Sequence, residues 1–208
     1  MSDADSAQIY LATPPAFSLA DFPDQLAAML DRFDVACVRI ALASQDASDL
    51  ARAADVLRDV AHARDVAIVI DDHFRMVKAH GLDGVHLTSA SRNVREARKE
   101  LGQDAIVGAY CGTSRHAGMT AAEIGTDYIS FGPVTNPGAL GDGSVATAEL
   151  FQWWSEMIEV PVVAEGAVTE AALPAIKDHI DFLTLGSEIW SHGADAPAAM
   201  ERFTNLLR

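Results

Sequence analysis

Two neighbouring carboxylates, Asp71 and Asp72, stand directly after the apolar run 66–70. Paired carboxylates at the end of a strand either share a divalent cation or push one member toward protonation. The alternative is that Asp72 or His73 only caps the following helix, which explains one carboxylate and leaves the other unexplained. The pair therefore favours a cation site by a narrow margin.

An isolated arginine, Arg39, lies within a second apolar run, 36–41. A guanidinium is costly to bury without a partner, and its planar fork suits a phosphate or a carboxylate. Arg39 is therefore either a phosphate ligand or half of an internal ion pair with Asp71 or Asp72. His86, inside a third apolar run, is interpreted as a core histidine with satisfied hydrogen bonds.

Two short motifs near the C-terminus, Gly166-Ala167 and Gly186-Ser187, each follow an apolar run. Backbone N–H groups in such turns, at the start of a helix, commonly hold a phosphate group. The glycines are equally consistent with tight turns that need their conformational freedom. From these residues alone, phosphate binding and simple turn formation are weighed about evenly.

These residues are positioned by eight short apolar runs that alternate with eight segments of helical periodicity. The runs are typical of strands buried on both faces, and the helical segments carry one apolar stripe each. The predicted strands are 8–13, 36–41, 66–70, 84–87, 105–110, 128–131, 161–164 and 182–185. The predicted helices are 22–33, 48–63, 74–80, 94–101, 114–124, 147–158, 170–178 and 196–207.

Eight alternating strand and helix units predict a single-domain (β/α)8 TIM barrel over residues 8–208, with a flexible N-terminal segment 1–7. A doubly wound open sheet alternates in the same way, but it would carry a Gly-x-Gly-x-x-Gly turn after the first strand. In a barrel, residues at the carboxyl ends of the strands share one mouth. The mouth would include Arg39, Asp71, Asp72, Cys111, the 132–144 loop, Glu165 and the two glycine motifs.

Composition limits the partners and the compartment. The 208 residues carry a formal charge of -15, which repels nucleic acid and anionic membranes, so a phosphate ligand must be held locally. No apolar run reaches the length of a membrane span, and two cysteines make no disulfide framework. We expect a cytoplasmic protein that binds a small molecule, with homo-oligomers left open. Cys111 is interpreted as a small polar lining residue more readily than as a reactive thiol.

Four segments resemble thiamine phosphate synthases, in order and over nearly the whole chain. VAIVIDDHFRMVKAHGLDGVHL (66–87) is similar to that family's third to fourth strand region. VGAYCGTSRHAGM (107–119) and GTDYISFGP (125–133) resemble its following segments, and PVVAEGAVT (161–169) resembles its Pro-x-Val-Ala-Ile-Gly-Gly-Ile-Thr. The resemblance implies the same barrel. It also implies a reaction that joins a pyrimidine methyl diphosphate to a thiazole phosphate and releases pyrophosphate, with magnesium on the leaving group.

The resemblance assigns roles to individual residues. Asp72 falls on a magnesium-binding position, and Asp71 takes the place of an asparagine beside it. Arg39 falls on the pyrophosphate arginine, and Cys111 on the pyrophosphate serine. The positions that match the thiazole phosphate loops are Gly166, Ala167, Gly186 and Ser187.

The family's cationic residues are only partly kept. Its two lysines are absent, one at Ala41 and one within the segment 137–140, and its second metal aspartate is Ser91. Glu165 places a carboxylate beside the phosphate loops. We therefore expect weak magnesium binding, an internal ion pair at Arg39, and a synthase of weak or lost activity.

Three alternatives stay open at the level of sequence. The chain is a non-catalytic binder of a phosphorylated thiazole or thiamine phosphate, or it is a thiazole tautomerase-like isomerase, for which no clear general base is visible. The third alternative is that Arg75, Arg92 or Arg115 replaces the missing lysines and preserves the synthase reaction by a rearranged site.

Overall fold

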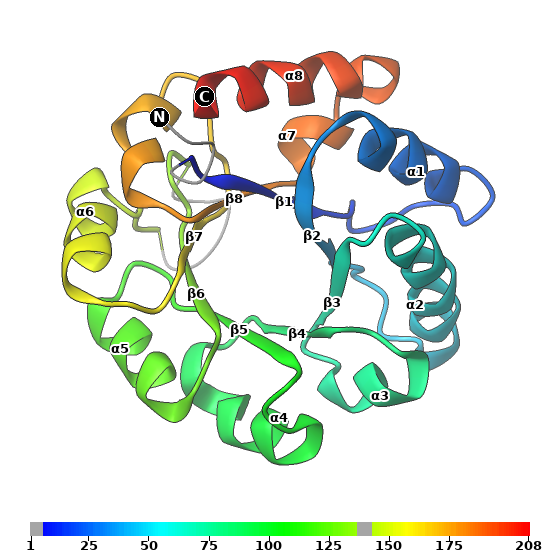
Figure 1. Cartoon of the computed structure of the whole chain (residues 1–208), viewed down its shortest axis with the longest axis horizontal. Coiled ribbons are helices and arrows are strands. Elements are labelled where there is room, and N and C mark those ends of the chain that lie inside the picture. The colour runs from blue at the N-terminus through cyan, green and yellow to red at the C-terminus, as the bar shows by residue number, and fades with distance from the viewer. Residues whose placement is uncertain (1–5, 137–142) are drawn as a thin grey trace.

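The computed structural model describes residues 6–136 and 143–208, and it is a closed barrel of eight parallel strands in chain order (Figure 1). The predicted single-domain (β/α)8 TIM barrel is confirmed. Residues 1–5 of the predicted flexible segment lie outside the described residues. The strands are β1 (Gln8–Ala12), β2 (Val35–Ile40), β3 (Ala67–Asp71), β4 (Gly84–Leu87), β5 (Ile106–Tyr110), β6 (Tyr128–Phe131), β7 (Val162–Ala164) and β8 (Phe182–Leu185).

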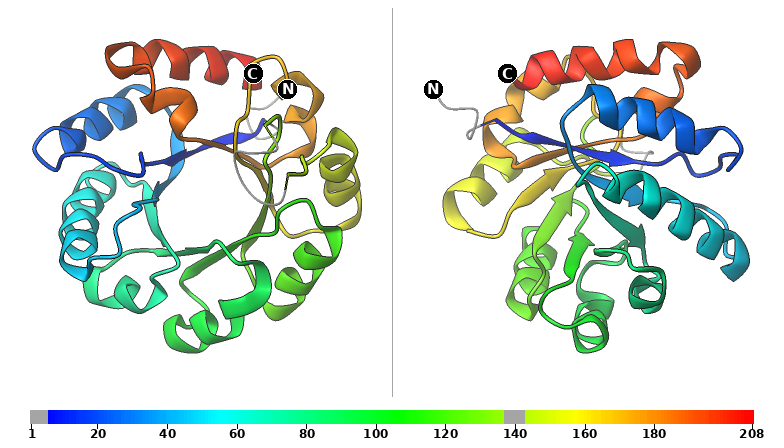
Figure 2. Two further views of the ribbon diagram at one scale, coloured as in Figure 1. Left: turned by 180° about the vertical axis from the view of Figure 1, so that it is seen from behind. Right: turned by 45° about the vertical axis from the view of Figure 1, so that its right-hand side comes forward.

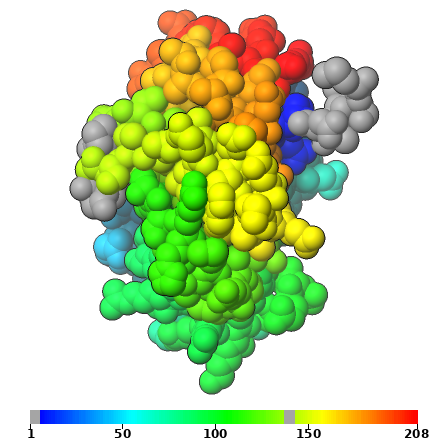
Figure 3. All heavy atoms as spheres, turned by 90° about the vertical axis from the view of Figure 1, so that its left-hand side faces the viewer, coloured from blue at the N-terminus to red at the C-terminus, as the bar shows by residue number. Residues whose placement is uncertain are grey.

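The α-helices surround the strands on the outside (Figure 2). They are α1 (Phe22–Arg32), α2 (Ala47–His62), α3 (Val77–His80), α4 (Val94–Leu101), α5 (Arg115–Ile124), α6 (Ala148–Met157), α7 (Ser187–Trp190) and α8 (Ala196–Leu207). Figure 3 shows side chains of α5 (green) and α6 (yellow) covering one side of the barrel. No helix among the described residues is both long and apolar enough to cross a bilayer.

The helix predicted over 170–178 is wrong. The chain between β7 and β8 instead forms two short 3-10 turns, Leu173–Ala175 and Lys177–His179. Pro174 lies inside the first turn, where its ring removes a donor and hinders a continuous α-helix. The side chains of Leu173 and Ile176 are buried against the barrel. The apolar spacing therefore predicted the buried positions correctly, whereas the α-helical geometry predicted for them is wrong.

Three aspartates stand directly before β4, β6 and β8. Each accepts a hydrogen bond from a backbone amide of the preceding strand, β3, β5 or β7. Asp83 Oδ2 accepts from Ile68 N at 2.7 Å, Asp127 Oδ2 from Val107 N at 2.7 Å, and Asp181 Oδ2 from Val162 N at 2.8 Å. Each carboxylate thereby satisfies an amide at the amino-terminal edge of the barrel, where the ladder leaves it unpaired. The regular use of one residue type fixes the register of three strand pairs.

The barrel interior has an aromatic centre. The rings of Tyr10 and Tyr128 meet edge to face at 5.7 Å, with Val69 and Val163 packed around them. Gly108 on β5 makes room for this arrangement, because a Cβ there would lie 1.9 Å from the Tyr128 ring. Tyr128 thus occupies the space that a side chain on β5 would fill, and its hydroxyl reaches the polar layer above.

Candidate active site

The charged residues of the site meet just above this aromatic centre. Arg39, on β2, donates from Nη1 to Glu165 Oε2 at 2.7 Å, and its Nε lies 3.5 Å from Asp71 Oδ1. The guanidinium carbon also lies 5.8 Å from the centre of the Tyr10 ring. The internal ion pair expected at Arg39 is present, and it has two carboxylate partners.

Glu165 was not identified from the sequence as the closer partner of Arg39. It directly follows β7, and only 3% of its surface is exposed. Burial opposes the charge on Arg39, yet Glu165 and Asp71 together raise the pKa of the guanidinium well above its usual value. The sequence feature that could have indicated this role is the position of Glu165, an acidic residue inside the apolar run 161–167 at the end of a barrel strand.

A chain of hydrogen bonds joins Tyr10, Tyr128 and His86, and it stops short of Glu165. The Tyr10 and Tyr128 hydroxyls share a hydrogen bond of 2.6 Å, and the Tyr128 hydroxyl bonds His86 Nδ1 at 2.9 Å. His86 Nε2 has no hydrogen-bond partner among the described residues and lies 3.7 Å from Glu165 Oε2. Burial, and then the charge of Arg39, lower the pKa of His86, so the ring is neutral. The expectation of a satisfied core histidine is therefore right for one ring nitrogen only.

Asp71 is the second carboxylate on Arg39. Burial raises its pKa from 3.8 to about 7; Arg39 opposes the shift, while Glu165 and Asp72 add to it. Its Oδ1 and the Arg39 Nε that faces it lack hydrogen-bond partners among the described residues. Asp71 is consequently the more weakly held of the two carboxylates, and its pKa lies near neutral pH.

We predict that this titration makes stability depend on pH. The folded state holds the Asp71 proton more tightly than the unfolded state, so the stabilisation is complete at low pH and is lost as pH rises through about 7. Because the side chain is 23% exposed, we expect a loss of only about 1–3 kcal/mol between about pH 5 and about pH 8. Urea unfolding across this range measures it. Asp71→Asn should flatten the profile, and an unchanged slope in that variant would assign the effect to another group.

Asp72 faces away from this pair. Its carboxylate accepts from Thr88 N at 2.9 Å and from the Thr88 hydroxyl, and its backbone has a φ of 54°. Among the described residues, no three His, Cys, Asp or Glu side chains come together as a metal centre. Asp72 can thus offer one carboxylate to a cation, and further ligands would have to come from water or from a bound phosphate.

The two glycine motifs lie in adjacent loops, as the sequence predicts for a phosphate site. Gly166 and Ala167 both have positive φ values, 82° and 53°. The amide of Gly186, however, donates to Glu188 Oε2 at 3.0 Å, and the amide of Val168 donates to Glu188 Oε1 at 3.2 Å. A carboxylate of the chain itself therefore bridges donors from the loops after β7 and β8. Glu188 was not singled out from the sequence.

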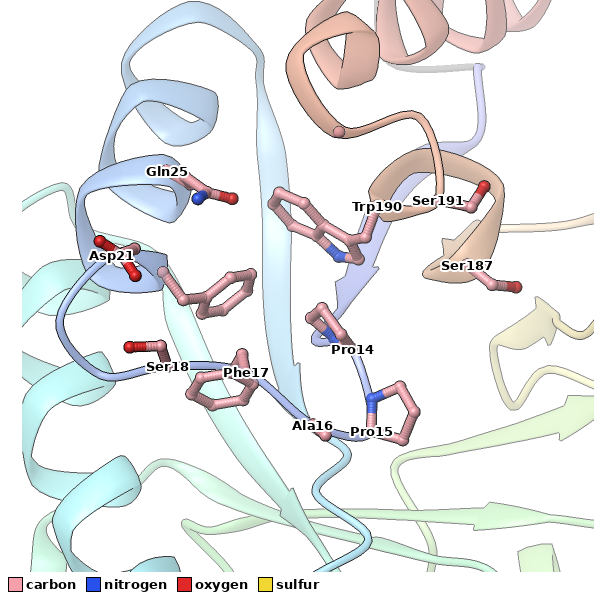
Figure 4. A pocket seen from close by; sticks show the side chains of 12 residues that line it. Pro14, Pro15, Ala16, Phe17, Ser18, Asp21, Gln25, Ser187, Trp190 and Ser191 are labelled. Carbon is pink, nitrogen blue, oxygen red and sulfur yellow. The ribbon is translucent and has the colours of Figure 1, made fainter.

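A pocket of about 460 Å³ adjoins these loops, between the segment after β1 and α7 (Figure 4). The rings of Phe17 and Phe22 lie 4.4 Å apart, and Phe22 meets Trp190 at 5.0 Å. Figure 4 shows Trp190 facing the loop after β1, whereas the Ser187 side chain points to the other side of α7. Ser187 and Trp190 both line this pocket. The Gly186-Ser187 motif is thus next to an aromatic surface that can accept a planar ring.

The remaining sequence-predicted residues are less directly placed for chemistry. Burial raises the pKa of the Cys111 thiol to about 12, Glu165 adds to this, and the thiol donates to Ala109 O at 3.5 Å. Cys111 is therefore a neutral lining group. Arg75 pairs with Glu96 at 2.5 Å, and Arg115 covers the Trp153 ring at 4.5 Å. Both arginines have partners on the outer helices, which gives no support to their replacing the missing lysines.

The fold and the site together define a TIM-barrel protein whose charged groups gather at the carboxyl ends of the strands, where enzymes of this fold carry their active sites. The comparison with known families narrows this class. The family model for thiamine monophosphate synthase matches residues 9–189. The chain belongs to the thiamine monophosphate synthase family.

Relatives and solved structures agree with this assignment. Thiamine-phosphate synthase of Rhodospirillum centenum is 41% identical, over 97% of this chain and 98% of that protein. The Erythrobacter litoralis thiamine-phosphate synthase is 35% identical, over 96% and 95%. The structure of a thiamine phosphate pyrophosphorylase from Pyrococcus furiosus superposes with a TM-score of 0.82 at 20% identity, covering 98% of this chain and 96% of that one. At that identity, the structural match supports the fold alone.

Proposed function

We propose that the protein is a thiamine phosphate synthase-like member of thiamine biosynthesis with a degenerate site, whose synthase activity is weak or lost. The observation that carries the proposal is that Glu165 and Asp71 already bind Arg39, the position expected to hold pyrophosphate. A leaving pyrophosphate would compete with two carboxylates for this cation. The charge of -15 adds repulsion at long range.

The chain's own residues divide the task as follows. Arg39 would hold the pyrophosphate, and Gly166, Ala167 and Ser187 would hold the thiazole phosphate once Glu188 moves aside. The aromatic pocket beside Ser187 would accept a ring. Departure of pyrophosphate builds negative charge, which needs cations or donors in place before the reaction. Among the described residues, Arg39 is the cation placed at the ends of β2 and β3 to stabilise that charge, so the rate should be low.

Asp72 is the residue that would hold magnesium, because Mg²⁺ often takes one or two carboxylates and completes its shell with water and substrate phosphates. When bound, the ion would neutralise charge on the pyrophosphate. We predict that magnesium alone binds more weakly than micromolar, since Asp72 already accepts two hydrogen bonds from Thr88. Isothermal titration calorimetry measures this affinity. A dissociation constant below micromolar would show that a fuller ligand set forms in solution.

The decisive experiment is to supply both family substrates with magnesium and to measure pyrophosphate release. We expect turnover far below the enzymatic norm of about one per second. The activity of a conventional thiamine phosphate synthase, assayed beside it, controls for the substrates. Turnover near the norm would overturn the degenerate-site proposal and favour a rearranged but competent site.

A non-catalytic binder is the second candidate, because the glycine loops and the adjoining pocket remain even where the lysines are missing. In a thermal-shift assay, this reading predicts stabilisation by thiazole phosphate and thiamine phosphate without turnover. The tautomerase-like alternative needs an accessible base. His86, the nearest imidazole to Glu165, is fully buried, which argues against that alternative.

A further inference from the structure

Glu165 lies between a cation and an unpartnered imidazole nitrogen. Its Oε2 accepts from Arg39 at 2.7 Å, and the same oxygen lies 3.7 Å from His86 Nε2. His86 Nε2 is buried and has no hydrogen-bond partner among the described residues. The side chains of Glu165 and His86 are 4% and 1% exposed, so water cannot freely solvate a charge placed on either.

We propose that binding of pyrophosphate to Arg39 is coupled to the uptake of one proton by Glu165, which then hydrogen-bonds His86 Nε2. This inference rests on the proposed function, in which Arg39 receives the anion. The proton comes from solvent, and no bond other than O–H is formed. His86 acts as a hydrogen-bond acceptor, and its other nitrogen can donate to Tyr128.

The coupling follows from charge and burial. When the guanidinium turns toward an anion, Glu165 loses the charge that offsets its own. A buried carboxylate without a cation is strongly disfavoured, and neutralisation by a proton is the usual escape. The neutral carboxyl group is also a donor, and His86 Nε2 is the acceptor that the native arrangement leaves unused. Proton uptake therefore satisfies two groups at once.

The groups that face Glu165 from neighbouring strands support this assignment. Arg39 on β2 is the cation that departs, Asp71 on β3 is a second acid, and His86 on β4 is neutral. Tyr128 is hydrogen-bonded, and Cys111, just after β5, carries a thiol whose pKa is near 12. No cation other than Arg39 is paired with Glu165 among the described residues. Asp71 is the competing proton acceptor, because burial raises its pKa to about 7. The geometry that favours Glu165 is its position 3.7 Å from His86 Nε2, the buried acceptor that the structure leaves without a partner among the described residues.

The test is calorimetric titration of the full chain with inorganic pyrophosphate in two buffers of different ionisation enthalpy. The difference in heat gives the protons taken up per bound ligand. Wild type should take up about one proton more than Glu165→Gln, because the glutamine cannot be charged. Proton exchange by pyrophosphate itself is common to both proteins and cancels. Asp71→Asn is the matched control and should keep the uptake.

A second measurement needs no variant and tests for the proton uptake itself, whereas the variants above assign the proton to Glu165. Sulfate carries no titratable proton near neutral pH, so its affinity for wild type, read from thermal shifts, should weaken by about tenfold for each unit of rising pH. Pyrophosphate binding with equal proton uptake in wild type and Glu165→Gln, or sulfate binding that is independent of pH, would overturn the coupling and leave the proposed function intact. Absence of any pyrophosphate binding would overturn the coupling, whereas the degenerate site, in which two carboxylates compete for Arg39, would stand. Uptake lost in Asp71→Asn would move the proton to Asp71 and refute the role of Glu165.

Discussion

Replacing Arg39 with methionine is expected to lower the free energy of unfolding by about 3–5 kcal/mol, the usual cost of leaving a buried charge without its partner. Glu165, whose side chain is 4% exposed, would lose its cation, so that its carboxyl group would either stay charged in a buried site or take up a proton. Both outcomes destabilise the folded state at neutral pH relative to the intact ion pair. Methionine fills a similar volume, so the loss is electrostatic and not a cavity effect. Urea unfolding followed by circular dichroism measures the change.

The matched control is Arg75→Met, which breaks an ion pair with Glu96 in which the side chains are 75% and 55% exposed. That change should cost less than about 1 kcal/mol, because water solvates both charges. The double variant Arg39→Met with Glu165→Leu should recover much of the loss, since it removes the stranded charge. Equal effects of Arg39→Met and Arg75→Met would show that the buried ion pair adds nothing specific.

Introducing lysine at Ala41 and Leu140 is expected to raise the rate of pyrophosphate release by on the order of 10²-fold or more, because each preorganised donor at a developing charge is worth about 3 kcal/mol. Ala41 follows β2, two residues beyond Arg39, and is half-buried, so a lysine there can extend to the mouth. Leu140 lies outside the described residues and is chosen from the sequence alone. Steady-state assays with both substrates and magnesium give the rate.

Val56→Lys adds one positive charge, half of what the two lysines at the mouth add, at an exposed site on α2, and it should leave the rate unchanged. If the two lysines at the mouth give no gain, Glu165→Ile added to them separates two causes. A gain only in the triple variant would assign the fault to the Arg39 ion pair. Continued inactivity would place the fault in the segment around Pro137, and a gain with Val56→Lys would reduce the effect to net charge.

The barrel could be predicted because its strands are short, continuous and apolar, with helical stripes between them. The strand 182–185 and the helices 94–101 and 196–207 were predicted with the bounds that the structure shows. The segment 170–178 failed because apolar spacing is nearly the same for an α-helix and for successive 3-10 turns. Pro174 was the residue that favoured the turns.

The sequence predicts where in the barrel the site lies, but it does not predict which side chains contact one another there. Arg39 and Asp71 follow from strand ends and barrel geometry, and the structure brings them together. The roles of Glu165 and Glu188 could not be read from the sequence, since they depend on which amide or guanidinium each carboxylate reaches across the barrel. Spacing along one strand predicts the direction of a side chain, whereas a partner on another strand depends on register.

Because β1 pairs with β8 as well as with β2, the barrel has no first strand. The numbering of the strands depends only on which connection between a helix and a strand is left open in the ring. In the ring, α8 stands before β1 in the same way that each other helix stands before the strand that follows it. Joining the ends and opening another helix-to-strand connection would preserve every strand pairing. Each connection between a helix and the next strand is therefore a potential pair of termini for a circularly permuted variant.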